Sequence, residues 1–216
     1  MNTHLKMEPS NYHPEWVESR TRFITNYFNH DLTNKTVLEL GAFNGDIGGN
    51  LAKLGARITS AEGRKQNLLL GRRRYPKHNW MHVDLDVEEW AFDEKYDIII
   101  HFGVLYHLKN PDFYLREAQK RCNHFFLESE VLDNSDKEIT NIRPSNYTES
   151  EGACGQGLNC ECQLSTRYIE NRLTNFKRFD LEELNGGMHY YNWESKNDNS
   201  YKLGRRRFWV CGGQSR

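Results

Sequence analysis

The sequence predicts an α/β fold built on a mostly parallel sheet, and three observations support this. Short apolar runs typical of buried strands alternate with segments of helical periodicity along the first 130 residues. The clearest run, at residues 96–102, is almost continuously apolar, as in strands covered on both faces. Acidic residues or glycines also follow several runs, at residues 39–45, 62–63 and 84–85. Because parallel strands end at one sheet edge, these residues are expected near one ligand.

The first half of the chain predicts a regular alternation of elements. Pro14 can start a helix over residues 14–30, where aromatic and apolar residues recur at helical spacing. Residues 1–34 would thus be an arm and a helix whose apolar side packs on the sheet. A later helix should turn Leu68, Leu69 and Leu70 inward. Strands are expected at 36–40, 57–62, 80–83, 96–102 and 125–127, and helices at 46–54, 65–75 and 112–121.

The second half is less regular. Periodicity fails between residues 133 and 167, a polar stretch that is long for a loop in a compact domain. We expect it to be an insertion over the substrate site. A short helix at 168–173 follows, with strands at 176–179, 188–193 and 207–211. No internal repeat marks a second unit, so residues 1–216 are expected to form a single domain.

Composition excludes some classes of function. The net charge of −1 provides no general attraction to nucleic acid or to a membrane surface. No apolar run approaches the twenty residues of a membrane helix, and the N-terminus lacks the apolar core of a signal peptide. Five cysteines do not suggest a secreted disulfide framework, so a cytoplasmic location is expected. The oligomeric state is not indicated.

Residues 36–45, TVLELGAFNG, predict a strand, a glycine turn and the start of a helix. Glycine permits a sharp turn and close approach of a ligand. The pattern is Gly-x-x-x-Gly, which departs from the Gly-x-Gly-x-x-Gly of dinucleotide sites. Glu39, two residues before Gly41, would repel a pyrophosphate but suits a cationic ligand. A nicotinamide dehydrogenase is therefore disfavoured.

This stretch resembles motif I of the class I S-adenosylmethionine (SAM)-dependent methyltransferases, usually Asp/Glu-x-Gly-x-Gly-x-Gly, with Phe43 at the central glycine. The segment Gly103-Val-Leu-Tyr-His107, followed by Asn110-Pro111, is similar to the loop after motif IV, especially in the transfer-RNA wobble-uridine carboxymethyltransferases. The resemblance implies SAM as cofactor, and it implies as an alternative that the helix of residues 1–34 covers the cofactor as a lid. It also implies a Rossmann-like sheet of seven strands, mostly parallel with an antiparallel last strand, and helices on both faces.

The resemblance also implies which residues bind the cofactor. Glu62 would accept hydrogen bonds from both ribose hydroxyls. Asp84 would accept from the adenine amino group, and Leu85 would donate its backbone N–H to the ring. The expected cofactor-binding set is Glu39, Gly41, Ala42, Phe43, Asn44, Gly45, Glu62, Gly63, Asp84, Leu85, His101, Phe102 and Gly103.

Tyr106, His107 and Glu128 are the candidate catalytic residues, because they lie near the expected reaction centre. Methyl transfer depends mainly on alignment and exclusion of water, so a strong catalytic motif is not required. His107 is either a general base, since histidine titrates near neutral pH, or a structural contact. Glu128 could bind an amine or hydroxyl of the substrate.

The acceptor is expected to be a small molecule, with RNA as the alternative. Arg72–Arg74 and Arg205–Arg207 could form an RNA-binding face, or could cap a helix and line a solvated strand edge. A non-catalytic SAM-binding module is the alternative from another class. Cys154, Cys160 and Cys162 are one ligand short of a structural zinc site, so no metal is expected.

Overall fold

The computed structural model describes residues 14–92, 95–108, 110–131, 140–144, 160–179 and 205–212. Seven strands form the main sheet: β1 (Thr36–Leu40), β2 (Arg57–Glu62), β3 (Asn79–His82), β4 (Tyr96–Phe102), β5 (Cys122–Val131), β8 (Phe176–Phe179) and β9 (Arg205–Gly212). The helices are α1 (Pro14–Tyr27), α2 (Asp46–Ala52), α3 (Lys65–Arg74), α4 (Pro111–Lys120), α5 (Thr166–Glu170) and the short 3₁₀ helix η1 (Leu105–His107). A separate two-stranded sheet pairs β6 (Thr140–Pro144) with β7 (Cys160–Leu164).

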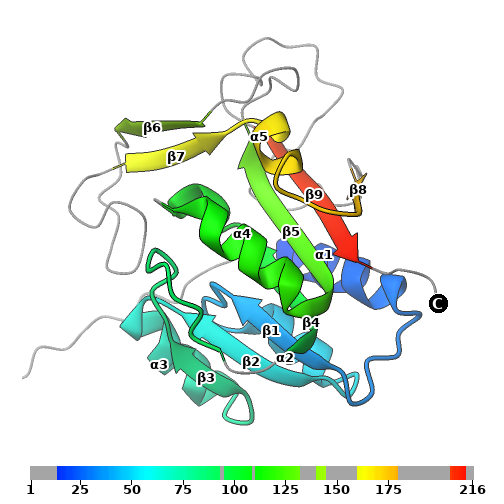
Figure 1. The fold of residues 1–216 in the computed structure, drawn as a ribbon. Coiled ribbons are helices and arrows are strands. Elements are labelled where there is room, and N and C mark those ends of the chain that lie inside the picture. Colours follow the sequence, from blue (N-terminus) through cyan, green and yellow to red (C-terminus); the bar gives the residue numbers. More distant parts are fainter. Residues whose placement is uncertain are drawn as a thin grey trace, which may run out of the picture.

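The strand order is β3-β2-β1-β4-β5-β9-β8 (Figure 1). The pairs from β3 to β5 are parallel, whereas β9 runs antiparallel to both β5 and β8. This confirms the predicted mostly parallel sheet with an antiparallel last strand. Leu40 pairs with Ala61 on β2 and with His101 on β4, so the carboxyl ends of three strands meet at one edge.

Helices cover both faces of the sheet, as predicted (Figure 1). On β4, Ile98 and Ile100 pack into the core beneath α1 and α2, whereas Ile99 packs into the core beneath α4 and α5. Side chains alternate along a strand, so a strand buried on both faces must be apolar throughout. This explains why β4 was the clearest strand in the sequence.

Several local expectations were wrong. Leu69 is 53% exposed, because consecutive residues of a helix cannot all face one side. The first helix ends at Tyr27, since Asn29 and His30 have positive φ and leave the helical conformation. Within the 133–167 segment, the described residues 140–144 and 160–164 form the antiparallel β6–β7 pair, which the sequence pattern did not predict. The expected strand at 188–193 lies outside the described residues.

Two glycines of α2 make room for side chains of neighbouring elements. Gly48 faces Glu39 and Gly49 faces the ring of Tyr75. The Tyr75 ring stacks on His78 at a centroid distance of 5.0 Å, and its hydroxyl donates to Asp46 at 2.7 Å. These contacts hold the ring against the helix, so Gly49 is a packing requirement.

We expect Gly49→Ala to destabilise the protein by about 1 to 2 kcal/mol. Replacing a glycine with alanine inside a helix normally stabilises it, by up to about 1 kcal/mol. Here the new Cβ would lie 2.2 Å from a Tyr75 ring carbon, and the ring is held on both sides. Urea unfolding measures the change. In a Tyr75→Leu background the same substitution should stabilise, and a stabilising effect in the wild type would contradict the packing.

Candidate active site

A cleft runs along the carboxyl edge of β1, β2 and β4, and it consists of two adjoining cavities. The larger, of about 630 Å³, lies between the ends of β2, β3 and β4. The smaller, of about 380 Å³, lies between the end of β1, the start of α2 and the start of α1. Gly41, Phe43 and Phe102 line both cavities and separate them.

Glu62 presents a fixed carboxylate to the larger cavity. Its Oε2 accepts from the backbone N–H of Phe43 at 2.7 Å, and its Oε1 accepts from the backbone N–H of Arg64 at 2.9 Å. Burial raises the pKa of Glu62, against the lowering effect of these hydrogen bonds. Val83 and Leu85 form an apolar wall of the same cavity. This half therefore suits a flat apolar group joined to vicinal hydroxyls.

Glu39 lines the smaller cavity and is 5% exposed. Its Oε2 accepts from the backbone N–H of Gly48 at 3.2 Å. Its pKa is raised to about 8, mainly by burial; the hydrogen bond from Gly48 lowers the pKa, and the nearby carboxylates of Asp46 and Glu62 raise it. A bound cation would favour the ionised carboxylate and lower this pKa again. The smaller cavity therefore suits a positively charged group.

The turn between β1 and α2 has positive φ at three positions: 67° at Gly41, 54° at Phe43 and 81° at Gly45. A Cβ at position 41 would lie 2.2 Å from Val104 Cγ2, so only glycine fits there. Phe43 adopts the left-handed conformation at the position where motif I, which this stretch resembles, has its central glycine. A bulky residue thus holds a backbone conformation that glycine adopts more easily.

We expect Phe43→Gly to be more stable than Phe43→Ala by about 1 kcal/mol. Both changes remove the ring, but only glycine relieves the strain of a positive φ in an L-residue. Thermal unfolding of the two variants measures the difference. Arg73, on the exposed side of α3, is the control position. There Arg73→Ala should be more stable than Arg73→Gly, because alanine has the higher helix propensity. Equal stability of the two position-43 variants would contradict strain in the turn.

Most predicted site residues meet in this cleft, and some lie elsewhere. Gly45 lies outside both linings and precedes α2. Asp84 is exposed, and its Oδ1 accepts from the Asp86 backbone N–H at 2.9 Å. His101 is fully buried towards Phe125, and burial lowers its pKa to about 4. Those lining the two cavities are Glu39, Gly41, Ala42, Phe43, Asn44, Glu62, Gly63, Leu85, Phe102, Gly103 and His107.

Sequence reasoning missed several lining residues. Trp16 and Val17 of α1 form one wall of the smaller cavity, with Asp46 at the start of α2. The aromatic residue near the start of a predicted lid helix was the available signal. Arg64 and Asn67 line the larger cavity, and no pattern in the sequence distinguished them from other polar residues of the third helix.

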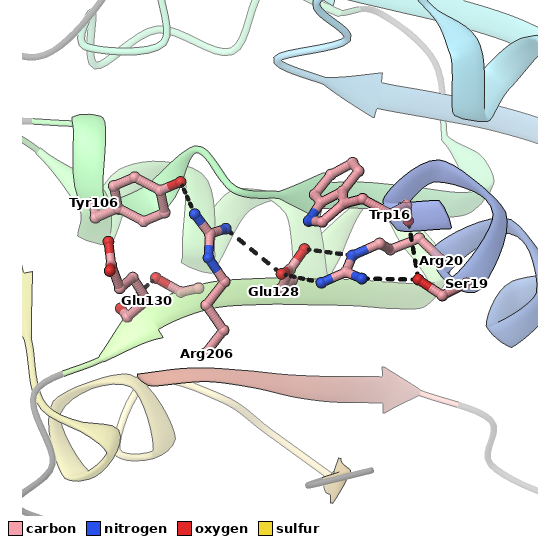
Figure 2. Close-up of polar contacts among 8 residues, drawn as sticks. Trp16, Ser19, Arg20, Tyr106, Glu128, Glu130 and Arg206 are labelled. Atoms are coloured by element: carbon pink, nitrogen blue, oxygen red, sulfur yellow. Dashed lines mark hydrogen bonds and ion pairs between the residues drawn. The ribbon is translucent and has the colours of Figure 1, made fainter. Parts of the chain in front are cut away.

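A buried charge network adjoins the cleft (Figure 2). The Glu128 carboxylate, fully buried at the end of β5, accepts from Arg20 Nη2 at 2.9 Å and from Arg20 Nε at 3.4 Å. Arg206 Nη1 of β9 lies 3.5 Å from the same carboxylate, and Arg206 Nη2 donates to the Tyr106 hydroxyl at 2.5 Å. Glu128 and Tyr106 thus belong to an internal network, and neither lines the two cavities.

The described residues offer no cluster of histidine, cysteine or acidic side chains suited to a metal ion. Cys154 and the side chains of Cys160 and Cys162 lie outside that description. Cys122 and Cys211 are free thiols whose pKa burial raises to about 12, which leaves them unreactive. No helix in the described part of the chain combines the length and the apolarity needed to cross a bilayer.

Comparison with known proteins identifies the fold. The chain is similar to the N-terminal domain of EvdMO1 in the presence of S-adenosylhomocysteine (SAH) and D-fucose, with a TM-score of 0.68 and 18% identity over 94% of this chain and 85% of that one. It is similar to magnesium protoporphyrin IX methyltransferase (ChlM) from Synechocystis PCC 6803 with bound SAM, with a TM-score of 0.58 and 14% identity over 91% and 78% of the two chains. It is also similar to the glycopeptide N-methyltransferase MtfA complexed with sinefungin, with a TM-score of 0.58 and 12% identity over 96% of this chain and 90% of that one.

A search of curated proteins found no match. The family model described as a methyltransferase domain matches residues 11–195. That range includes the strand–turn–helix around Glu39, the end of β2 and the loop of Tyr106 and His107. The protein therefore belongs to the methyltransferase-domain family, and it is a methyltransferase with the class I, SAM-dependent fold.

Proposed function

We propose that this protein transfers a methyl group from SAM to an oxygen, nitrogen or carbon nucleophile of a small-molecule acceptor. The observation that carries the proposal is the cleft with one buried carboxylate in each half, Glu62 in the larger and Glu39 in the smaller. An adenosine joined to a cationic amino acid matches this arrangement in shape and in charge. A pyrophosphate does not, because it would repel each of these carboxylates in its ionised form and offers no cation to compensate one.

The chain's own groups provide a fitting site for this cofactor. The Glu62 carboxylate would accept from the ribose hydroxyls, and Val83 and Leu85 would pack against the adenine. Glu39 would face the ammonium group. Asp84 stays a candidate partner of the adenine amino group at the rim. The predicted roles of Glu39, Glu62 and Leu85 are consistent with the cavities they line.

Bound SAM supplies a methyl group attached to a sulfonium, and the sulfur becomes a neutral thioether when the methyl group is transferred. The protein aligns the acceptor, excludes water and takes up a proton where the acceptor loses one. His107 lines the larger cavity beside Gly103 and is our candidate for the proton acceptor. Tyr106 lies beside it, at a ring-centroid distance of 4.3 Å. The η1 turn carries both residues, and in our proposal the acceptor binds on the side of the larger cavity that His107 lines.

The 133–167 segment is our candidate for the cover of the acceptor site. Its strand β7 contacts η1, the turn that carries Tyr106 and His107. Leu164, at the end of β7, is fully buried in the same core as Leu105. A small acceptor held beneath this segment would be shielded from water.

The basic residues give little support to an RNA acceptor. Arg72 donates to the backbone oxygen of Trp80, and Arg74 pairs with Asp46. Arg206 is 7% exposed and faces the buried network, whereas Arg207 donates to Thr166. Arg206 is thus an internal residue, and neither of the two alternatives, an RNA-binding face or a solvated strand edge, describes it.

A turnover assay tests the proposal. The purified protein is incubated with SAM and a panel of small hydroxyl and amine compounds, and SAH is measured by mass spectrometry. We expect SAH to form only with an accepted compound. We expect Glu62→Ala to weaken SAM binding about 10-fold or more, through loss of hydrogen bonds to a charged group. Glu88→Ala is the control, because it removes an exposed carboxylate outside the cleft lining.

Two outcomes would contradict the proposal. SAM binding without turnover across the panel and a matched RNA panel would favour a non-catalytic binding module. Turnover with RNA alone would assign the acceptor to the other class. Titration with NAD, which carries a pyrophosphate, should show no binding.

A further inference from the structure

The wall of the smaller cavity is built on a charged side chain of α1. Trp16 lines the cavity, and Arg20 follows one helical turn later on the same face. The Arg20 guanidinium lies 4.4 Å from the centroid of the Trp16 ring, in cation–π contact. The indole is thus held between Arg20 and the cavity. Arg20 itself does not line the cavity.

Arg20 is fixed at its other end to the sheet. Along β5, Phe126 and Glu128 point towards α1, because alternate residues of a strand share a face. Both partners of the Arg20–Glu128 pair are fully buried. Arg20 Nη1 also donates to Ser19 Oγ at 2.9 Å, which ties the guanidinium to its own helix. The pair therefore defines where α1 sits over the end of the sheet.

The same carboxylate connects to the other half of the cleft. Arg206 reaches from β9 to Glu128 and also donates to Tyr106. A Cβ at Gly103, which lines the larger cavity, would lie 3.3 Å from Arg206 Nη1. One buried network thus supports Trp16 on one side and the Gly103–Tyr106 loop on the other (Figure 2).

We propose that Arg20 is a positioning residue for the cofactor: it holds α1 against Glu128 so that Trp16 encloses the amino-acid end of SAM. This assignment rests on the proposed function, which places the ammonium group beside Glu39 in the smaller cavity. An apolar residue at position 20 could pack in the same space, but it would not fix the helix to one carboxylate in one direction. The arginine thereby sets the position of the wall.

The test compares two ligands that share the adenosine and differ in the group that would occupy the smaller cavity. SAH carries the amino-acid end, whereas 5′-methylthioadenosine has the same adenosine and lacks that end. Calorimetric titration gives both affinities for the wild type, Arg20→Met, Arg20→Lys and Trp16→Leu. Arg22→Met is the matched control, because Arg22 lies on the exposed side of α1 and pairs only weakly with Glu18 at 3.7 Å.

We expect Arg20→Met and Trp16→Leu to weaken SAH binding about 10-fold while the affinity for 5′-methylthioadenosine stays within about 2-fold. Arg20→Lys, which keeps the charge, should recover part of the loss, and Arg22→Met should match the wild type. A purely structural effect would lower both affinities together through the folded fraction. If Arg20→Met does not fold, Arg20→Lys and Trp16→Leu still report the difference.

The results separate this assignment from the proposed function. If the wild type binds SAH and the variants lose both ligands equally, or lose neither, the role of Arg20 is overturned and the function stands. If the wild type binds no SAH, the proposed function is overturned and the assignment falls with it.

Discussion

Glu39→Gln should weaken SAM binding by about 10- to 100-fold, because a hydrogen-bonded charge is worth about 1.5 to 3 kcal/mol. Glutamine keeps the shape of the side chain and can still accept from the Gly48 N–H, which lies 3.2 Å from the carboxylate. It cannot balance the charge of an ammonium group. Calorimetric titration of SAM measures the loss, and Glu88→Gln, an exposed carboxylate, is the matched control.

The same substitution should stabilise the ligand-free protein at alkaline pH. The pKa of Glu39 is raised from 4.5 to about 8 in the folded protein, mainly by burial. A raised pKa adds stability that is fully present below pH 4.5 and is lost as the pH rises through 8. Glutamine has no such dependence, so above pH 8 the variant should gain on the order of a few kcal/mol relative to the wild type. Thermal unfolding between pH 5 and 9 measures this.

Cofactor binding should also release a proton. At pH 7 the free protein holds Glu39 protonated, whereas an ammonium beside it favours the carboxylate. The affinity for SAM should therefore rise with pH up to about 8 and then level off. Calorimetric titrations in phosphate and in Tris at pH 7 report the number of protons released, because the two buffers differ in ionisation enthalpy. We expect close to one proton for the wild type and none for Glu39→Gln. Unchanged affinity, or a variant less stable than the wild type at pH 9, would contradict the role of Glu39.

The sheet and the two acidic side chains of the cleft were predictable because both depend on local patterns. Strands such as Tyr96–Phe102 are apolar on both faces and end at residues that the parallel topology must gather at one edge. Glu39 and Glu62 follow from this argument alone. Trp16 does not, because the periodicity of a helix shows which side is buried but not where on the distant sheet that side packs.

The run Arg205–Arg207 shows why the rest was out of reach. Three arginines in one strand cannot all face solvent if both faces of the sheet are covered, so at least one had to turn inward. Which one depends on register: Glu130 pairs with Arg206 and Glu128 pairs with Phe208. A shift by one residue would exchange the faces. Register between β5 and β9 is a long-range property, so the sequence suggested a surface where the structure has a buried cation.

Glu128→Gln should lower the free energy of unfolding by about 3 to 5 kcal/mol, the largest stability effect we expect in this chain. The carboxylate is the shared partner of two buried guanidinium groups, at 2.9 Å from Arg20 and 3.5 Å from Arg206. An amide would leave both charges buried beside a neutral group. Urea unfolding measures the loss.

A double variant and a surface control make this test specific. Adding Arg20→Met to Glu128→Gln removes one of the uncompensated charges, so the double variant should recover part of the lost stability. Glu117→Gln removes a carboxylate that pairs with Lys120 and Arg121 on the surface of α4, and it should cost about 1 kcal/mol or less. If Glu128→Gln is as stable as the wild type but turns over more slowly, Glu128 would instead be the substrate-binding residue that the sequence first suggested. A loss of stability that the double variant partly restores would show that Glu128 acts by holding α1 and β9 in place.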